Sequence, residues 1–131
     1  MDIDIDVCPS KRETVFEETR KETGELGCVH VCTYGTLTTK ATIKLAGRGY
    51  RSEEYPNGIP LEETEYISSL VPSERGFLWT LKDVINGNPD KGRKASVQFN
   101  AEIEKYPGLK EILFKIEGLV VQAGIHASGV I

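Results

Sequence analysis

The sequence predicts a mixed α/β fold in which a helical segment interrupts the strands of one sheet. Acidic and apolar residues alternate strictly over Asp2–Val7, and Cys28–Tyr34 is rich in β-branched and aromatic residues, so each predicts a strand. Three amphipathic stripes follow before a short apolar end at Gly129–Ile131. A helical insert between strands is typical of an α/β core with a helical subdomain. We expect three parts: 1–35, the helical insert 36–122, and a return strand in 123–131.

The composition is that of an ordinary globular protein. Hydrophobic residues make up 39% and charged residues 27% of the 131 residues, enough for one real core. We expect no membrane span and no signal peptide, because no apolar run is long enough and the N-terminus is acidic. Three cysteines argue against a disulfide framework and for a reducing, cytoplasmic location. The net charge of −4 does not by itself indicate a nucleic-acid-binding protein.

The first helix is expected directly after the acidic strand. Ser10, followed three residues later by Glu13, is a capping box that predicts its N-terminus. Val15 and Phe16 would face inward, and Gly24 would end the helix.

A second helix is expected after the strand at Cys28–Tyr34, which Gly35 would end. It would run from about Thr36 to Ala46 and be closed by two glycines, Gly47 and Gly49. The Pro- and Gly-containing segment 51–60 and the segment 86–94 are expected to be loops. Apolar residues at helical spacing predict three more helices, around 66–71, 78–85 and 109–116.

Asp4 and Asp6 carry the strongest sign of a functional site. On a strand, residues i and i+2 point to the same face with Cα atoms roughly 6.6 Å apart. Two such carboxylates can converge on divalent cations roughly 3.5–4 Å apart, as two-metal phosphoryl transfer requires. Magnesium prefers carboxylate and phosphate oxygens. An acidic edge strand or terminus without metal is the alternative.

Two other metal sites have weaker support. A calcium loop of the EF-hand type would use acids at its positions 1, 3, 5 and 12, namely Asp2, Asp4, Asp6 and Glu13. Against this, Val7 stands where the loop needs glycine, and Pro9 follows. A zinc site at Cys28, His30 and Cys32 is disfavoured, because strand geometry places the two cysteines roughly 13 Å apart.

The remaining candidates are single residues and one basic stripe. Lys40 and Lys44 are spaced four apart on the expected second helix, Arg48 lies a further four residues along, and Arg51 follows. Such a stripe can track a phosphate backbone, or it can be an ordinary solvated face. His126 is more typical of a structural residue than of a catalyst. Ser128 lacks the surroundings of a hydrolase nucleophile.

Four motifs follow one another along the chain: Asp2–Cys8 (DIDIDVC), Lys11-Arg12, Thr33–Thr36 (TYGT) and His126–Val130 (HASGV). Their order resembles the catalytic region of the bacterial DNA polymerase III alpha subunit, the replicative C-family polymerase. Val7 and Tyr34 stand where this family commonly has phenylalanine, which affects packing rather than chemistry.

The resemblance implies a fold and roles for particular residues. The chain would be a partial palm related to the polymerase beta nucleotidyltransferases, a mixed sheet with a helix, interrupted by a helical thumb. Asp4 and Asp6 would be catalytic and hold two Mg²⁺ ions. Lys11 and Arg12 would lie near the triphosphate or support the palm. The thumb would begin near Thr36, and its basic stripe, Lys40, Lys44, Arg48 and Arg51, would contact DNA.

The resemblance also implies a function for the complete subunit, of which this chain would be a fragment. That function is template-directed addition of dNTPs to a primer. The partners would be primer–template DNA, dNTPs, and, through the full-length protein, the sliding clamp and other replisome subunits. His126 would be a structural residue of the palm. The third metal-binding aspartate and the phosphate-holding turn would lie elsewhere in the subunit, so we expect the chain alone to be inactive. A non-enzymatic DNA-binding or metal-binding module remains the alternative.

Overall fold

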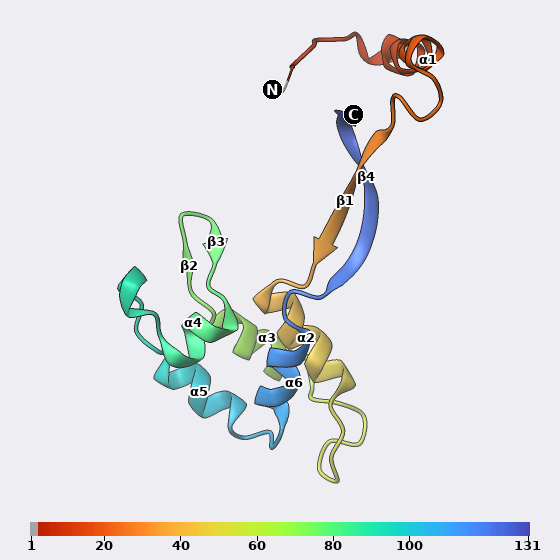
Figure 1. Cartoon of the computed structure of the whole chain (residues 1–131). Helices are drawn as coiled ribbons and strands as arrows, with labels where there is room; N and C mark the ends of the chain where they lie inside the picture. Colours follow the sequence, from red (N-terminus) through yellow and green to blue (C-terminus); the bar gives the residue numbers. More distant parts are fainter. Residues whose placement is uncertain (1–2) are drawn as a thin grey trace. The chain divides into compact units, whose positions relative to one another are not determined.

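A computed structural model describes residues 3–131 and divides them into two compact units (Figure 1). The first unit contains the described residues up to Tyr34 together with Ala123–Ile131, and the second is Gly35–Gln122. Asp2, which is part of the expected first strand, lies outside the described residues. The fold is mixed α/β, and its elements in chain order are η1 (Pro9–Lys11), α1 (Arg12–Thr23), β1 (His30–Thr36), α2 (Thr39–Gly49), α3 (Leu61–Ser69), β2 (Ser73–Glu74), β3 (Phe77–Leu78), α4 (Leu81–Asn86), η2 (Pro89–Lys91), α5 (Val97–Ile103), α6 (Leu109–Ile116) and β4 (Val120–Val130).

Strands β1 and β4 pair with each other in a two-stranded antiparallel ribbon. Val29 and Ile131 exchange both backbone hydrogen bonds, with N···O distances of 2.7 and 2.9 Å, which only antiparallel strands allow. The predicted second strand is confirmed, with its start shifted to His30. The return strand is much longer than its apolar end suggested, because it begins at Val120. Most side chains of β4 are exposed.

Helix α1 confirms the first predicted helix, but the predicted capping box is wrong. The N-cap residue is Lys11, and no side chain caps the helix. Ser10 lies in the preceding 3₁₀ turn, where its Oγ is 3.3 Å from Cys8 Sγ. Phe16 faces inward and stacks on the His30 ring at a centroid distance of 4.0 Å, whereas Val15 is exposed. The helix therefore packs on β1 through one aromatic contact.

The strand predicted at the acidic N-terminal run is not formed. Residues 3–8 are irregular and exposed, and residues 3–7 make no backbone hydrogen bond to another described residue. Alternation gives a strand two faces, but a stable strand also needs a neighbour for its N–H and C=O groups. In the described structure β1 and β4 take each other as partners, and residues 3–8 do not join their sheet.

The second unit is built around one helical core. Helix α2 packs against α3 and α6, and α5 packs against α3 and α4. Amphipathic spacing explains the packing, because each helix turns its apolar stripe inward. The largest fully buried side chains include Phe99, Ile43, Ile67, Leu81 and Leu113.

Several helix assignments differ from the sequence-based expectation. Helix α3 covers Leu61–Ser69 rather than 66–71, and α4 begins only at Leu81, because Leu78 belongs to strand β3. Helix α2 begins three residues later than expected, where Thr38 Oγ1 accepts a hydrogen bond from Ala41 N, and it includes Gly47 and Gly49. Helix α5 was not expected. It begins after Ser96, whose hydroxyl accepts a hydrogen bond from the Phe99 backbone N–H at 3.2 Å. Its apolar residues, Val97, Phe99, Ala101 and Ile103, stand at every second position and so gave no helical spacing.

Strands β2 and β3 form a short hairpin that was also not expected (Figure 1). Arg75 and Gly76 occupy its two central turn positions with φ angles of 52° and 83°. Positive φ at both positions is the conformation of a type I′ turn, which suits the twist of a tight hairpin. Strands of two residues give no alternation to recognise.

The chain enters and leaves the helical unit at adjacent positions. Leu37 N donates to Leu119 O at 3.0 Å, and Gly118 N donates to Leu37 O at 3.0 Å. Beside them, Glu117 Oε1 accepts a hydrogen bond from Leu81 N at 2.8 Å and lies 2.7 Å from Thr39 Oγ1. One carboxylate thus joins the end of α6 to the first residues of α2 and α4. Within residues 3–131 no helix is long and apolar enough to cross a membrane.

Candidate functional site

The two candidate catalytic carboxylates, Asp4 and Asp6, lie on the irregular segment before α1. Both are exposed, and within residues 3–131 neither forms an ion pair or a side-chain hydrogen bond. Their oxygens are therefore free to coordinate a hard cation, so the donor set fits magnesium. The apolar residues between them are also exposed, Ile3 at 76% and Ile5 at 75%, and do not anchor a strand face.

A complete metal site is not assembled by the part of the chain that the structure describes. No group of three or more His, Cys, Asp or Glu side chains lies close enough there to hold a metal ion. Cys28 is buried, Cys32 is exposed, and the His30 ring is stacked on Phe16. Any cation at Asp4 and Asp6 needs further ligands from elsewhere.

Lys11 and Arg12 lie where the irregular segment meets the first helix. Lys11 is the last residue of η1, and Arg12 is the first residue of α1. Both side chains are exposed and make no ion pair among residues 3–131. Two uncommitted cations within eight residues of Asp4 and Asp6 give this short segment charges of both signs.

Three of the four residues of the predicted basic stripe lie on α2, Arg51 lies beyond its end, and two of the four are engaged. Lys44 Nζ pairs with Glu65 Oε1 at 3.2 Å. Arg51 Nη1 donates to the carbonyl oxygens of Arg48 and Tyr50, both at 2.7 Å, which ties it to the end of the helix. Arg48 is exposed, and Lys40 is half-buried. Glu65 therefore offsets the charge of Lys44, whereas Arg51 keeps its charge but uses one terminal nitrogen on the helix end.

His126 lies in β4, and its ring bonds to its own strand. Nδ1 accepts hydrogen bonds from Gly129 N at 2.7 Å and from Ser128 N at 3.2 Å. The side chain is exposed. The ring is thus engaged by backbone groups on one side and accessible on the other.

A buried ion pair in the helical unit was not anticipated. Asp83 is buried, and its Oδ2 lies 2.5 Å from Arg93 Nη1, while its Oδ1 accepts from Asn88 Nδ2 at 2.9 Å. The hydrogen bond from Asn88 lowers the pKa of Asp83, and Arg93 and Lys91 lower it further against the opposing effect of burial. The loop sequence around Asn88 predicted turns but gave no sign of this pairing.

The same guanidinium fixes the β2–β3 hairpin. Arg93 Nη2 lies 3.0 Å from Glu74 Oε2, and the group stacks 4.8 Å from the centre of the Trp79 ring. Hydrogen bonds to Glu74 and Asp83 raise the pKa of Arg93, so it remains charged. This network holds a hairpin and a loop together and therefore has a structural role.

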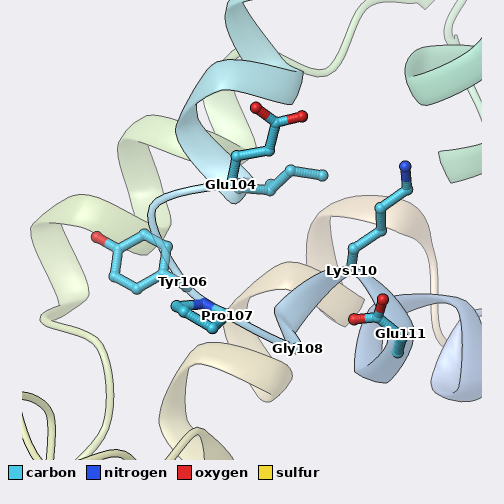
Figure 2. Close-up of a pocket in the computed structure, with 7 residues that line it drawn as sticks. Glu104, Tyr106, Pro107, Gly108, Lys110 and Glu111 are labelled. Atoms are coloured by element: carbon cyan, nitrogen blue, oxygen red, sulfur yellow. The ribbon is translucent and has the colours of Figure 1, made fainter.

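A shallow pocket of about 200 Å³ lies where α5 leads into α6 (Figure 2). Glu104, Lys110 and Glu111 contribute charged groups of both signs to its lining. The Tyr50 hydroxyl donates to Pro107 O at 3.0 Å and fixes the connecting turn. Charges of opposite sign around an open hollow do not select one class of ligand.

Comparisons with known proteins match the whole sequence. The family described as "Bacterial DNA polymerase III alpha NTPase domain" matches residues 1–131. A relative named "Probable DNA polymerase YorL", from Bacillus subtilis, is 38% identical over 130 residues, which is 99% of this chain and 9% of the relative. "DNA polymerase III subunit alpha" of Thermus aquaticus is 29% identical over 133 residues, which is 99% of this chain and 10% of that protein. The corresponding protein of Buchnera aphidicola (Acyrthosiphon pisum strain) is 33% identical over 132 residues, again 99% and 10%.

Proposed function

Because this chain belongs to the bacterial DNA polymerase III alpha family, we propose that it forms part of the nucleotidyl-transfer centre of a DNA-directed DNA polymerase. The observation that carries the proposal is the family match over residues 1–131, which includes the Asp4-Ile5-Asp6 motif and the His126–Val130 motif. The chain spans about a tenth of the length of the curated relatives, so the activity belongs to a larger polypeptide.

Asp4 and Asp6 are the proposed catalytic ligands. Their exposed carboxylates, uncommitted to any other described residue, fit a pair of Mg²⁺ ions. Bound there, the ions would lower the pKa of the primer 3′ hydroxyl and offset the charge that develops on the triphosphate. The protein's part is to hold both carboxylates toward the reacting phosphate. That requires residues 3–8 to be ordered by neighbours that β1 and β4 do not provide.

The remaining candidate residues receive supporting roles. Lys11 and Arg12, exposed and unpaired among residues 3–131, can attract the triphosphate of an incoming dNTP. Arg48, together with Lys40, is the part of the α2 stripe best placed to contact a phosphate backbone. Under this proposal the first unit is part of a palm and the helical unit is a thumb. Primer–template DNA and dNTPs would be substrates, and the clamp and other replisome subunits would bind through the complete subunit.

The test is made in the complete polymerase, with Asp4→Asn and Asp6→Asn as single variants. Each keeps the size of the side chain and removes the charge that the cations need. We expect primer extension to fall by at least about 10²-fold while affinity for primer–template DNA is retained. Asp90→Asn is the matched control, because Asp90 is an exposed acid of the helical unit outside the proposed site. Unchanged extension in both Asp4→Asn and Asp6→Asn would refute the proposal.

A further inference from the structure

Strand β4 carries more residues than the strand it pairs with. Val29 and Ile131 lie directly opposite each other, since they exchange both backbone hydrogen bonds. A Cβ atom placed on Gly124 would lie 3.3 Å from Thr33 Oγ1, which puts Gly124 opposite Thr33. The chain advances four residues from Val29 to Thr33 but seven from Gly124 to Ile131. Three residues of β4 are therefore in surplus, and the strand contains a β-bulge of more than one extra residue.

The surplus lies within Ile125–Ser128, the four residues of β4 that stand opposite the single residue Cys32. On the C-terminal side of this segment the register is regular. A Cβ atom placed on Gly129 would lie 3.2 Å from Val31 Cγ2, and these residues are each two positions from the paired Ile131 and Val29. A bulge interrupts the ladder, so its N–H groups need acceptors other than the partner strand. The His126 ring supplies that acceptor at 2.7 Å from Gly129 N and at 3.2 Å from Ser128 N.

This geometry determines the tautomer of the neutral ring. A nitrogen that accepts two N–H groups carries no proton, so Nδ1 is bare and the proton of the neutral imidazole resides on Nε2. A protonated Nδ1 would point its own hydrogen at two donors. His126 therefore acts on its backbone as an acceptor, in the manner that Asn and Asp side chains adopt in turns.

Gly129 is the second requirement of the bulge. A Cβ atom there would lie only 3.0 Å from His126 Nδ1, in addition to its close approach to Val31. Any larger residue at position 129 would push the imidazole ring away from the Gly129 N–H group, whose hydrogen bond the ring accepts. The contact between His126 and Gly129 thus explains why a glycine follows the histidine three residues later.

We propose that His126 is a positioning residue: its neutral imidazole closes the β4 bulge and thereby sets the register of Gly129–Ile131 against β1. Side chains alternate between the two faces of a strand. An odd number of extra residues therefore moves every following side chain to the opposite face of the ribbon. Without the bulge, the end of β4 would present the opposite set of side chains. The bulge itself depends only on contacts within this chain, and its importance for catalysis rests on the function proposed above.

Three variants separate the acceptor role from ring packing. Asn places a carbonyl oxygen close to the position of Nδ1, Gln extends its oxygen toward the position of Nε2, and Ala removes the acceptor. In this chain we expect His126→Asn to keep the Gly129 amide protected from hydrogen exchange within about threefold. His126→Gln and His126→Ala should each exchange about tenfold faster, as expected for loss of one hydrogen bond. The ¹⁵N spectrum of the wild-type ring should show the Nε2-protonated neutral form.

The outcomes are decisive in either direction. A ring protonated on Nδ1, loss of protection in His126→Asn, or full protection in His126→Gln each overturns the proposal. The Asn and Gln variants can be compared even if Ala unfolds the ribbon, and the buried Leu113 methyl signals report whether the helical unit remains folded. In the complete polymerase, His126→Gln should reduce kcat more than His126→Asn does. Active Asp4→Asn and Asp6→Asn enzymes would refute the proposed function but would leave the exchange result intact.

Discussion

The Nη1 atom of Arg93 lies 2.5 Å from the Oδ2 atom of buried Asp83. Its other terminal nitrogen reaches Glu74, so one side chain links the hairpin to the α4–η2 loop. Removal of one partner of a buried pair leaves an uncompensated charge, which costs more than the pair contributes when intact. The stability of this part of the helical unit therefore depends on the pair being complete.

Acid should weaken the protein through Asp83. Its pKa in the folded protein lies below the ordinary 3.8, so its contribution to stability is present above that value and is lost as pH falls through the lower, folded value. Asp83→Asn, which has no such titration, should show a shallower loss of thermal stability below about pH 4 than the wild type. The measurement is the thermal midpoint against pH, with Asp90→Asn as the control. Parallel curves for Asp83→Asn and the wild type would contradict the expectation.

Loss of Arg93 should lower stability at neutral pH. In Arg93→Leu, Asp83 keeps Asn88 and the more distant Lys91, whose Nζ is 3.7 Å away, but loses its closest cation. We expect the thermal midpoint to fall by several degrees. Arg75→Leu changes an arginine of the same hairpin region that has no ion pair among the described residues, and it should have a smaller effect.

Neighbouring residues of α6 should differ sharply in their tolerance of truncation. Leu113 is fully buried in the helical core, whereas Ile112 is 37% exposed. Leu113→Ala should reduce the free energy of unfolding by about 2–5 kcal/mol, because it removes methyl groups and leaves a cavity. Ile112→Ala should cost less than about 1 kcal/mol. Chemical denaturation of both variants measures the difference, and equal losses would show that α6 faces the core differently.

Two glycines of α2 should respond to alanine in opposite directions. A Cβ atom on Gly47 would meet Thr64 Cγ2 on α3, so Gly47→Ala should destabilise by about 1–3 kcal/mol through overpacking. Gly49 has no neighbour within 4 Å of that position, and alanine there should stabilise the helix by about 0.5–1 kcal/mol. Denaturation midpoints of the two variants test the close approach of α2 and α3.

The chain alone should bind metal weakly and should not extend primers. Within residues 3–131 only two carboxylates are available at the proposed site, and they lie on an irregular segment. Paramagnetic Mn²⁺ should broaden the signals of Asp4 and Asp6 only at concentrations near the millimolar range, the weak end of carboxylate sites. The Asp4→Asn, Asp6→Asn double variant is the control for broadening. Primer extension by the wild-type chain above that of the double variant would contradict this prediction.

Different sequence signals predicted different elements. Helix α6 could be recognised from its apolar stripe at helical spacing, strand β1 from its β-branched and aromatic residues, and the end of helix α1 from Gly24. Helix α5 could not, because its apolar residues alternate in the sequence, and the β2–β3 hairpin could not, because its strands have two residues each. The strand expected over the acidic run failed for another reason: alternation describes the faces of a strand but not whether a partner is present.

The candidate site could be predicted in part. The types and spacing of Asp4 and Asp6 could be recognised from the sequence, but their irregular backbone could not. Lys44 shows a related limit. Its position on α2 follows from periodicity, whereas its pairing with Glu65 on α3 depends on which helices pack together. Contacts between distant residues require the tertiary structure.

The two hydrogen bonds between Leu37 and the Gly118–Leu119 turn have a consequence for how such a protein can change over time. The two ends of the segment between Leu37 and Gly118 lie side by side. The length of this segment can therefore vary at a small cost in loop-closure entropy. Insertions or deletions inside this segment leave the pairing of β1 with β4 untouched. The helical unit can therefore diverge in sequence and in length while β1 and β4 keep their register.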